Sequence, residues 1–122
     1  MSTKYLMQQI AINELVKEVH QTAVEHGWWE EPKTFGELIA LIHSEVSEAL
    51  EEFRNGHDPK ETYYTKDKQG NDKPEGIPSE LADIVIRVFD LVGYYKIDIA
   101  GILFEKSEYN IHRPYKHGGK KI

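Results

Sequence analysis

Apolar residues recur along most of the chain at the spacing of an α-helix. In residues 4–26 they return every three or four positions, and Gly27 is placed to end this first helix. Thr34 and Glu37 form a capping-box pattern that starts a second helix, which we expect to run to about Arg54. The apolar positions of the second helix share one broad arc: Leu38, Ile39, Ile42, Val46, Ala49, Leu50 and Phe53.

Two further helices follow a polar stretch. The third, at about 79–94, is apolar on most of its circumference, which is typical of a helix at the centre of a bundle. The fourth is expected to begin after Asp98 as its N-cap and to end near His112, because Pro114 stops it. The pattern predicts an all-α fold, a four-helix bundle that forms a single domain over residues 1–122.

A polar segment at 55–77 interrupts the helical pattern. It is rich in Gly, Pro, Asn, Asp and Lys, and it is long for a connection in a compact domain. Such a length is typical of segments that are functional or mobile. Residues 62–65, with a turn at 69–72, predict a small β-hairpin inside it.

Two acidic pairs are the strongest chemical signal in the chain. Glu45 and Glu48 lie three positions apart in the second helix, and Glu80 and Asp83 do so in the third. Residues three apart share one helix face, so packing the two helices together would gather four carboxylates. Clustered carboxylates repel one another unless a cation neutralises them, and Mg²⁺ prefers oxygen ligands. Acidic residues on helices are often only solvated, but Glu45 borders the apolar arc and the third helix has little other polar surface.

Other polar residues extend this candidate site. Glu52 and Asp90 are candidates for an additional ligand or for a group that supports the ligands. Lys106, Asn110 and Arg113 fall in one narrow sector of the fourth helix, and such donors suit a triphosphate. A surface stripe of i,i+4 contacts explains the same three residues, and only the acidic pairs favour the phosphate interpretation.

Aromatic and histidine residues give weaker signals. Trp28 and Trp29 follow the end of the first helix, where either ring suits stacking on a nucleobase or packing at the edge of a core. The six histidines show no metal-ligand spacing, and the chain has no P-loop sequence. No grouping of serine, histidine and carboxylate indicates a covalent nucleophile.

Composition narrows the function further. Lys+Arg 15 against Asp+Glu 21 gives a formal net charge of -6, which argues against nonspecific binding of nucleic acid or of an anionic membrane. A bound metal would still allow a small phosphorylated ligand. The absence of cysteine excludes disulfides, zinc–thiolate sites and a cysteine nucleophile. Without a membrane-length apolar run or a signal-peptide pattern, the protein is expected to be soluble and cytoplasmic.

The two acidic motifs, in this order, give the chain a family resemblance. Residues 41–52, LIHSEVSEALEE, followed by ELADIVI from Glu80, resemble the MazG-like all-α nucleoside triphosphate pyrophosphohydrolases. That superfamily also includes dimeric dUTPases and phosphoribosyl-ATP pyrophosphohydrolase. The ending at 106–120 and the tryptophan-containing link before the second helix are similar as well. The 55–77 insertion is a departure, since it lengthens the gap between the motifs and leaves the choice of substrate open.

The resemblance implies a function. It implies a MazG-like four-helix fold working as a homodimer or homotetramer, and cleavage of a (d)NTP between the α and β phosphates into a monophosphate and pyrophosphate. Mg²⁺ or Mn²⁺ would be bound by Glu45, Glu48, Glu80 and Asp83, and Glu48 would orient or deprotonate the attacking water. Substrate would contact Lys106, Asn110, Arg113 and Trp28, within one chain or across a subunit boundary. Two alternatives stay open: dUTP or phosphoribosyl-ATP as substrate, and a catalytically silent helical module for protein association.

Overall fold

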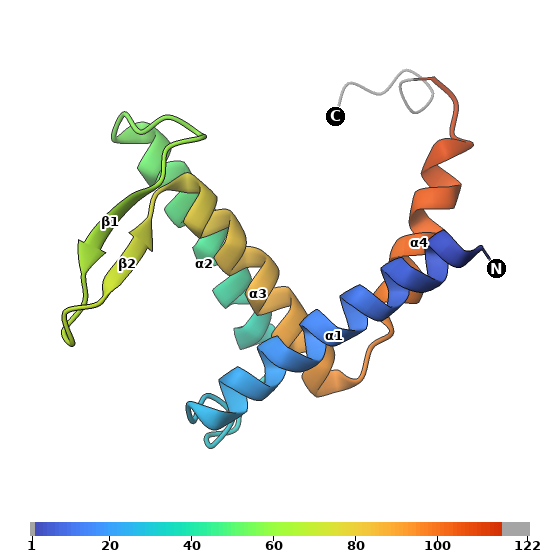
Figure 1. Cartoon of the computed structure of the whole chain (residues 1–122), viewed down its shortest axis with the longest axis horizontal. Helices are drawn as coiled ribbons and strands as arrows, with labels where there is room; N and C mark the ends of the chain where they lie inside the picture. Colours follow the sequence, from blue (N-terminus) through green and yellow to red (C-terminus); the bar gives the residue numbers. More distant parts are fainter. Residues whose placement is uncertain (1, 116–122) are drawn as a thin grey trace.

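The computed structural model describes residues 2–115 of the chain. Four helices and one two-stranded sheet make up this part (Figure 1). In chain order they are α1 (Thr3–Glu25), α2 (Phe35–Arg54), β1 (Tyr63–Lys66), β2 (Asp72–Glu75), α3 (Ile77–Tyr95) and α4 (Ile99–Ile111). The predicted mostly helical fold, with a hairpin between the second and third helices, is confirmed.

Local signals fix the helix ends close to the predicted positions. Thr34 and Glu37 form the reciprocal capping box at the start of α2. Asp98 caps α4 by accepting a hydrogen bond from the backbone of Gly101. Helix α1 ends at Glu25, and Gly27 follows with φ +84, a left-handed conformation that glycine adopts at low cost.

Helix α3 lies at the centre of the fold. It packs side by side with α2 and crosses α1 (Figure 1), as its apolar circumference predicts. The core cluster consists of Leu38 from α2 with Leu91 and Val92 from α3. Gly93 allows the crossing of α1, because a Cβ at this position would lie 2.8 Å from the Cβ of His20. The partly buried residues around the cluster are Val16, Trp29, Ile42, Val88 and Ile99.

The predicted hairpin forms within the polar segment. Strands β1 and β2 are antiparallel, and the register pairs Tyr63 with Glu75 and Thr65 with Lys73. The connecting turn is closed by Asp67, which accepts backbone hydrogen bonds from Gln69 and Asn71. The hairpin projects from the end of the α2–α3 pair where α2 ends and α3 begins (Figure 1).

The four helices do not close into one bundle within a single chain. Helix α4 packs on the N-terminal part of α1, where the rings of Tyr5 and Phe104 are 3.9 Å apart. This α1–α4 arm extends away from the α2–α3 arm, so the molecule is V-shaped (Figure 1). Few side chains are therefore fully buried, and many large apolar ones remain exposed on both arms. The bundle expected from the sequence would need further packing partners to bury these faces.

Candidate metal and phosphate site

Helix α2 supplies two carboxylates to the site. Its capping box sets where the helix begins, and the three-residue spacing then puts Glu45 and Glu48 on one face. Glu45 is only 9 % exposed, although it is charged, whereas Glu48 is accessible to solvent. A carboxylate this deeply buried needs a compensating partner, so Glu45 is the more informative of the two.

Helix α3 supplies the opposing polar residues. It begins after Gly76 with Pro78 in its first turn, where a missing backbone N–H has no cost. Glu80, Asp83 and Arg87 follow at intervals of three and four residues, so they share the stripe that faces α2. The sequence pattern predicted that the helix would have little polar surface outside this stripe.

Three carboxylates meet between the two helices. One oxygen from each of Glu45, Glu48 and Glu80 lies within 4.8 Å of the others, a spacing that would suit a single metal ion. One carboxylate oxygen of Glu45 and one of Glu80 (Oε2 in both) are buried without a hydrogen-bond partner. Unpaired buried oxygens of this kind are costly, and Mg²⁺ accepts oxygen donors, so the residues present fit a hard divalent cation.

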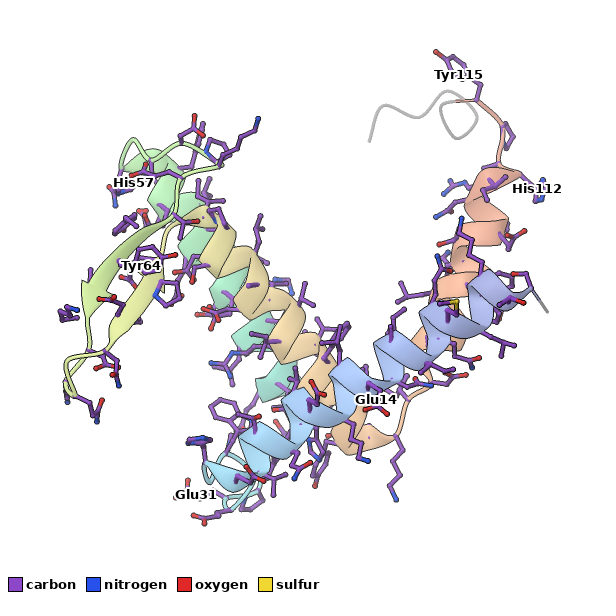
Figure 2. All side chains as sticks on the ribbon, viewed as in Figure 1. Glu14, Glu31, His57, Tyr64, His112 and Tyr115 are labelled. Atoms are coloured by element: carbon purple, nitrogen blue, oxygen red, sulfur yellow. The ribbon has the colours of Figure 1, made fainter. Side chains whose placement is uncertain are left out.

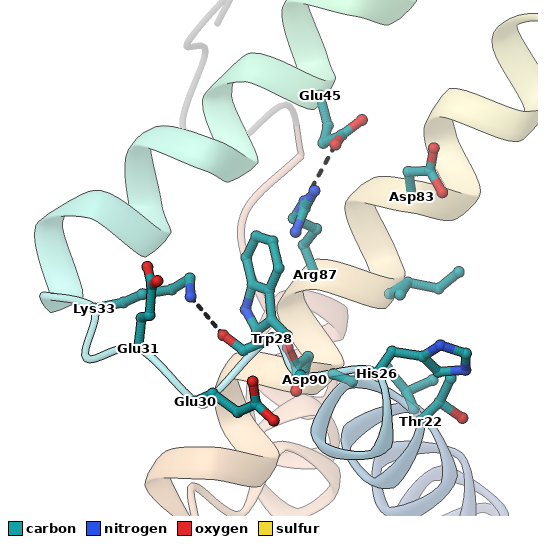
Figure 3. Close-up of a pocket in the computed structure, with 14 residues that line it drawn as sticks. Thr22, His26, Trp28, Glu30, Glu31, Lys33, Glu45, Asp83, Arg87 and Asp90 are labelled. Atoms are coloured by element: carbon teal, nitrogen blue, oxygen red, sulfur yellow. Dashed lines mark hydrogen bonds and ion pairs between the residues drawn. The ribbon is translucent and has the colours of Figure 1, made fainter.

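Asp83, the fourth predicted ligand, stands beside this group. Its oxygens are not among those gathered within 4.8 Å, so the structure brings together three of the four predicted ligands. The Asp83 carboxylate lies one helical turn from Arg87 and lines the adjoining pocket (Figure 3). Burial raises its pKa, and the negative charge of Glu45 adds to the effect, while Arg87 opposes it. Asp83 therefore belongs to the electrostatic surroundings of the site.

Within the acidic cluster, Glu80 has a raised pKa. Burial raises the pKa of Glu80 to about 7, and a hydrogen bond with Glu48 and the charges of the neighbouring carboxylates act in the same direction. A divalent cation would compete with the proton of Glu80 for the same oxygens. Metal binding at this site should accordingly strengthen as pH rises.

Arg87 is the functional candidate that sequence reasoning did not single out. Its Nε donates to Oε1 of Glu45 at 3.1 Å, and its guanidinium lies 4.5 Å from the ring centroid of Trp28 (Figure 3). Lys33 lies 4.5 Å from the same ring and donates to the backbone carbonyl of Trp28. Arginine in an otherwise acidic stripe was the available signal, since it is the only cation among the residues of α3.

A pocket of about 590 Å³ adjoins the acidic cluster. It lies between the end of α1, the link at 26–33 and the stripe of α3 (Figure 3). Trp28 lines this pocket, as its proposed role in substrate binding requires, but Lys33 and Arg87 both lie against its ring. Apolar and charged walls are combined here: Val19, Ala23 and Ile86 with Lys33, Asp83 and Arg87. The volume is within the range of sites for small molecules.

Asp90 anchors the link instead of joining the metal cluster. It is 7 % exposed, and its Oδ1 accepts hydrogen bonds from Trp29 Nε1 at 2.9 Å and from His20 Nδ1 at 2.7 Å. The ring of Trp29 also stacks on Tyr94, with centroids 3.9 Å apart. The expectation that Asp90 supplies a ligand is thus replaced by a structural role, because its buried oxygen is already engaged.

Glu52 anchors the hairpin. Tyr63 Oη donates to Oε1 of Glu52 at 3.0 Å, and His57 Nε2 lies 3.4 Å from Oε2. The rings of His57 and Tyr63 stack with centroids 4.8 Å apart. Glu52 lies one turn beyond Glu48 on α2, but it does not belong to the metal group found among the described residues. Its sequence position alone could not reveal that a tyrosine 11 residues later would engage it.

The cations expected on the fourth helix lie outside this site, and Arg113 follows the end of α4 at Ile111 instead of belonging to the helix. Lys106 and Arg113 both approach the ring of Tyr109, at 5.4 Å and 5.7 Å from its centroid. Figure 2 shows His112, next in sequence to Arg113, at the far end of the α1–α4 arm, whereas His57 lies at the far end of the α2–α3 arm. The structure therefore does not unite Lys106, Asn110 and Arg113 with the acidic cluster of the same chain. The ending that resembles MazG-like proteins continues into residues 116–120, which lie outside the described residues.

Comparisons with known proteins add no assignment. No family model matches the chain, and neither a curated protein nor a solved structure does. Within residues 2–115, none of the helices combines the length and apolar character needed to span a bilayer.

Proposed function

We propose that this protein is a metal-dependent nucleotide pyrophosphohydrolase that cleaves a nucleoside triphosphate between its α and β phosphates. The observation that carries the proposal is the unpaired buried oxygen on each of Glu45 and Glu80, within a cluster completed by Glu48. A divalent cation is the simplest partner that would relieve the cost of those oxygens. The resemblance of the two acidic motifs to MazG-like enzymes supports the same reaction.

The three clustered carboxylates would hold the cation, with Asp83 beside them. Mg²⁺ or Mn²⁺ would supply neutralising charge for the phosphates and would lower the pKa of a nearby water molecule. Hydrolysis of a phosphoanhydride depends mainly on positioning and charge neutralisation, so it needs no covalent nucleophile from the protein. The chain contains no cysteine, so it has no cysteine nucleophile, which is consistent with that chemistry.

Glu48 is proposed as the general base because it is the solvent-accessible member of the cluster. Water would attack the α phosphorus and form a new P–O bond. The bond from the α phosphorus to the bridging oxygen would break, and its electron pair would leave with pyrophosphate. Glu48 would take the proton of the attacking water and pass it to solvent, which leaves a nucleoside monophosphate and pyrophosphate as products.

Arg87 and the adjoining pocket are proposed to bind the nucleoside half of the substrate. The hydrogen bond to Glu45 uses only Nε of Arg87, so the terminal nitrogens of the guanidinium can approach a phosphate. The pocket beyond Arg87 has room for a sugar and base. Trp28 would act there mainly by fixing Arg87 and Lys33, because both cations lie against its ring.

Assembly of two or more chains is proposed to complete the site. Large apolar side chains are exposed on both arms, including Ile10, Leu50, Phe53, Phe104 and Ile111. Burying such faces in a homodimer or homotetramer would be favourable and would supply the packing that the single chain lacks. It would also allow Lys106, Asn110 and Arg113 of one chain to reach the acidic cluster of another.

A panel of NTPs, dNTPs and phosphoribosyl-ATP tests the proposal, with pyrophosphate release measured in Mg²⁺ and in EDTA. We expect release from at least one nucleotide, and we expect EDTA to abolish it. The ranking within the panel identifies the substrate, with dUTP included among the dNTPs. A folded protein that releases pyrophosphate from none of them would favour the catalytically silent helical module instead.

A further inference from the structure

The hairpin at 63–75 is attached to α2 and α3 next to the acidic cluster. Tyr63 binds Glu52, one turn beyond Glu48 on α2, and the ring of His57 stacks on Tyr63. On the second strand, Ser79 of α3 donates to the carbonyl of Pro74 at 3.0 Å. Gly76 has φ +105, and a Cβ there would lie 2.5 Å from the carbonyl oxygen of Glu61. The base of the hairpin is therefore held on both of its strands by the helices that carry the site.

One face of the hairpin is directed toward the helices. Side chains alternate between the two faces of a strand, and directly paired residues share a face. The register therefore puts Lys73 and Glu75 on the same face as Tyr63, which contacts α2. Lys66 belongs to the opposite face, where it pairs with Asp72. The two lysines thus differ in face while both are exposed.

Lys73 is the cation that the two strands carry on their helix-facing side. Burial raises the pKa of Asp83, and among the charges near it Arg87 and Lys73 oppose the increase, whereas Glu75 adds to it. Nζ of Lys73 lies 3.3 Å from Oε1 of Glu75, and the lysine side chain is 61 % exposed. An exposed ion pair of this kind is weak, so the ammonium group is free to exchange its partner for a phosphate.

The polar groups between α2 and α3 follow a linear order. From the pocket toward the hairpin, α3 presents Asp90, Arg87, Asp83 and Glu80, and α2 runs antiparallel beside it (Figure 1). At 1.5 Å per residue, Asp90 and Glu80 are separated by about 15 Å along the helix, which is the scale of an extended nucleotide. A nucleoside in the pocket with its α phosphate at the carboxylates would therefore extend its β and γ phosphates toward the hairpin.

We propose that the hairpin closes the phosphate end of the site and that Lys73 binds the departing pyrophosphate. The inference rests on the proposed function, and it gives the insertion a task that the helices alone do not perform. Lys73 would favour triphosphates over diphosphates, because a diphosphate places one phosphate fewer near the hairpin. The point charge of lysine suits a phosphate group that must leave after each turnover.

The test compares Lys73→Met with Lys66→Met, a matched loss of one lysine from the opposite face of the same hairpin. Binding of inorganic pyrophosphate in the presence of Mg²⁺ is measured by calorimetry, beside KM and kcat for a triphosphate and the corresponding diphosphate. We expect Lys73→Met to weaken pyrophosphate binding about tenfold, as expected for one charge-assisted hydrogen bond, and to reduce the preference for the triphosphate. Lys66→Met and binding of the nucleoside monophosphate should change less than about twofold.

Lys73→Arg should retain most of the pyrophosphate affinity, since it keeps the charge. Equal effects of Lys73→Met and Lys66→Met, or unchanged pyrophosphate binding in Lys73→Met, would overturn the inference while leaving the proposed function intact. A wild-type protein that neither releases nor binds pyrophosphate would overturn both. Both lysines are exposed, so the substitutions should not disturb folding.

Discussion

The two arms of the molecule use their charged residues in different ways. On the α2–α3 arm, two charged residues point inward: Glu45 and Asp90 are both buried, and one oxygen each of Glu45 and Glu80 has no hydrogen-bond partner. On the α1–α4 arm, charged groups lie at the surface, and Lys106 and Arg113 contact only the ring of Tyr109 among the interactions described. Burying charge is costly, so the unpaired buried oxygens indicate a binding site. The exposed cations of the other arm would take part in such a site only through contact with a second chain.

Removing a carboxylate of the acidic cluster from the α2–α3 arm should have the largest effect. We expect Glu45→Gln to lower pyrophosphate release by more than about 100-fold, since even groups that support metal ligands contribute 10–100-fold. The increase in Tm that Mg²⁺ produces should disappear at the same time. Glu105→Gln on α4 is the matched control and should change neither quantity. A Glu45→Gln protein that is still stabilised by Mg²⁺ would show that the cation binds elsewhere.

Mixing two inactive proteins tests whether the outward cations at the end of the α1–α4 arm act on a second chain. Glu48→Gln and Arg113→Ala are each expected to lose most activity. In a dimer with sites shared between chains, one of the two sites in a mixed dimer is intact, so random mixing restores about a quarter of wild-type activity. If cations and carboxylates act within one chain, every site keeps one substitution. No recovery after subunit exchange would then contradict the shared site.

The helices and the acidic pairs could be predicted from the sequence because their signals are local. Capping at Thr34 and Asp98 and the three-residue spacing of the carboxylates depend only on nearby residues. The partners of Asp90 and Glu52 could not be predicted in this way. His20 lies 70 positions from Asp90 in sequence, and the hydrogen bond between them exists only because α1 crosses α3.

The same limit applies to the predicted quartet and to the bundle. Spacing along a helix put Asp83 with Glu80, but the tilt of two packed helices decides which oxygens meet, and Asp83 falls beside the group. The apolar faces were predicted correctly as faces that need burial. The sequence could not reveal that α4 would leave them exposed within one chain by packing mainly on α1.

The buried anchor at Asp90 should contribute measurably to stability. Asp90→Ala leaves the donors of Trp29 and His20 without their acceptor, and we expect the free energy of unfolding to fall by about 3 kcal/mol. Asp90→Asn keeps an acceptor oxygen and should cost less than about 1 kcal/mol, as measured by urea denaturation at fixed protein concentration. Glu14→Ala on the solvent side of α1 should stay within about 0.5 kcal/mol. Equal decreases in the free energy of unfolding for all three variants would show that the hydrogen bonds of Asp90 do not stabilise the fold.

The smallest expected effect is the dependence of stability on pH without metal. The pKa of Glu80 is raised to about 7 in the folded protein, so the folded state holds a proton that the unfolded state has already released. The stabilisation that this proton gives the folded state is complete below the pKa that Glu80 has in the unfolded chain. It is lost as pH rises through about 7. In EDTA, Tm should therefore fall between pH 5 and pH 8, and less so in Glu80→Gln.

Magnesium should oppose the decrease in Tm between pH 5 and pH 8. Because the cation competes with the proton of Glu80, the increase in Tm produced by Mg²⁺ should be larger at pH 8 than at pH 5.5. Calorimetric scans at both pH values, with Mg²⁺ and with EDTA, measure the difference directly. An Mg²⁺ effect that is independent of pH would mean that the cation does not bind at Glu80.

The central claim is that the carboxylates clustered between α2 and α3 support metal-dependent hydrolysis. The most direct test is pyrophosphate release from the preferred nucleotide by wild type and by Glu48→Gln, with Mg²⁺ and with EDTA. We expect release by wild type in Mg²⁺ only, and a decrease of about 10²- to 10⁴-fold in Glu48→Gln, whose exposed side chain leaves the fold intact. Release that persists in EDTA, or that Glu48→Gln leaves unchanged, would contradict the claim.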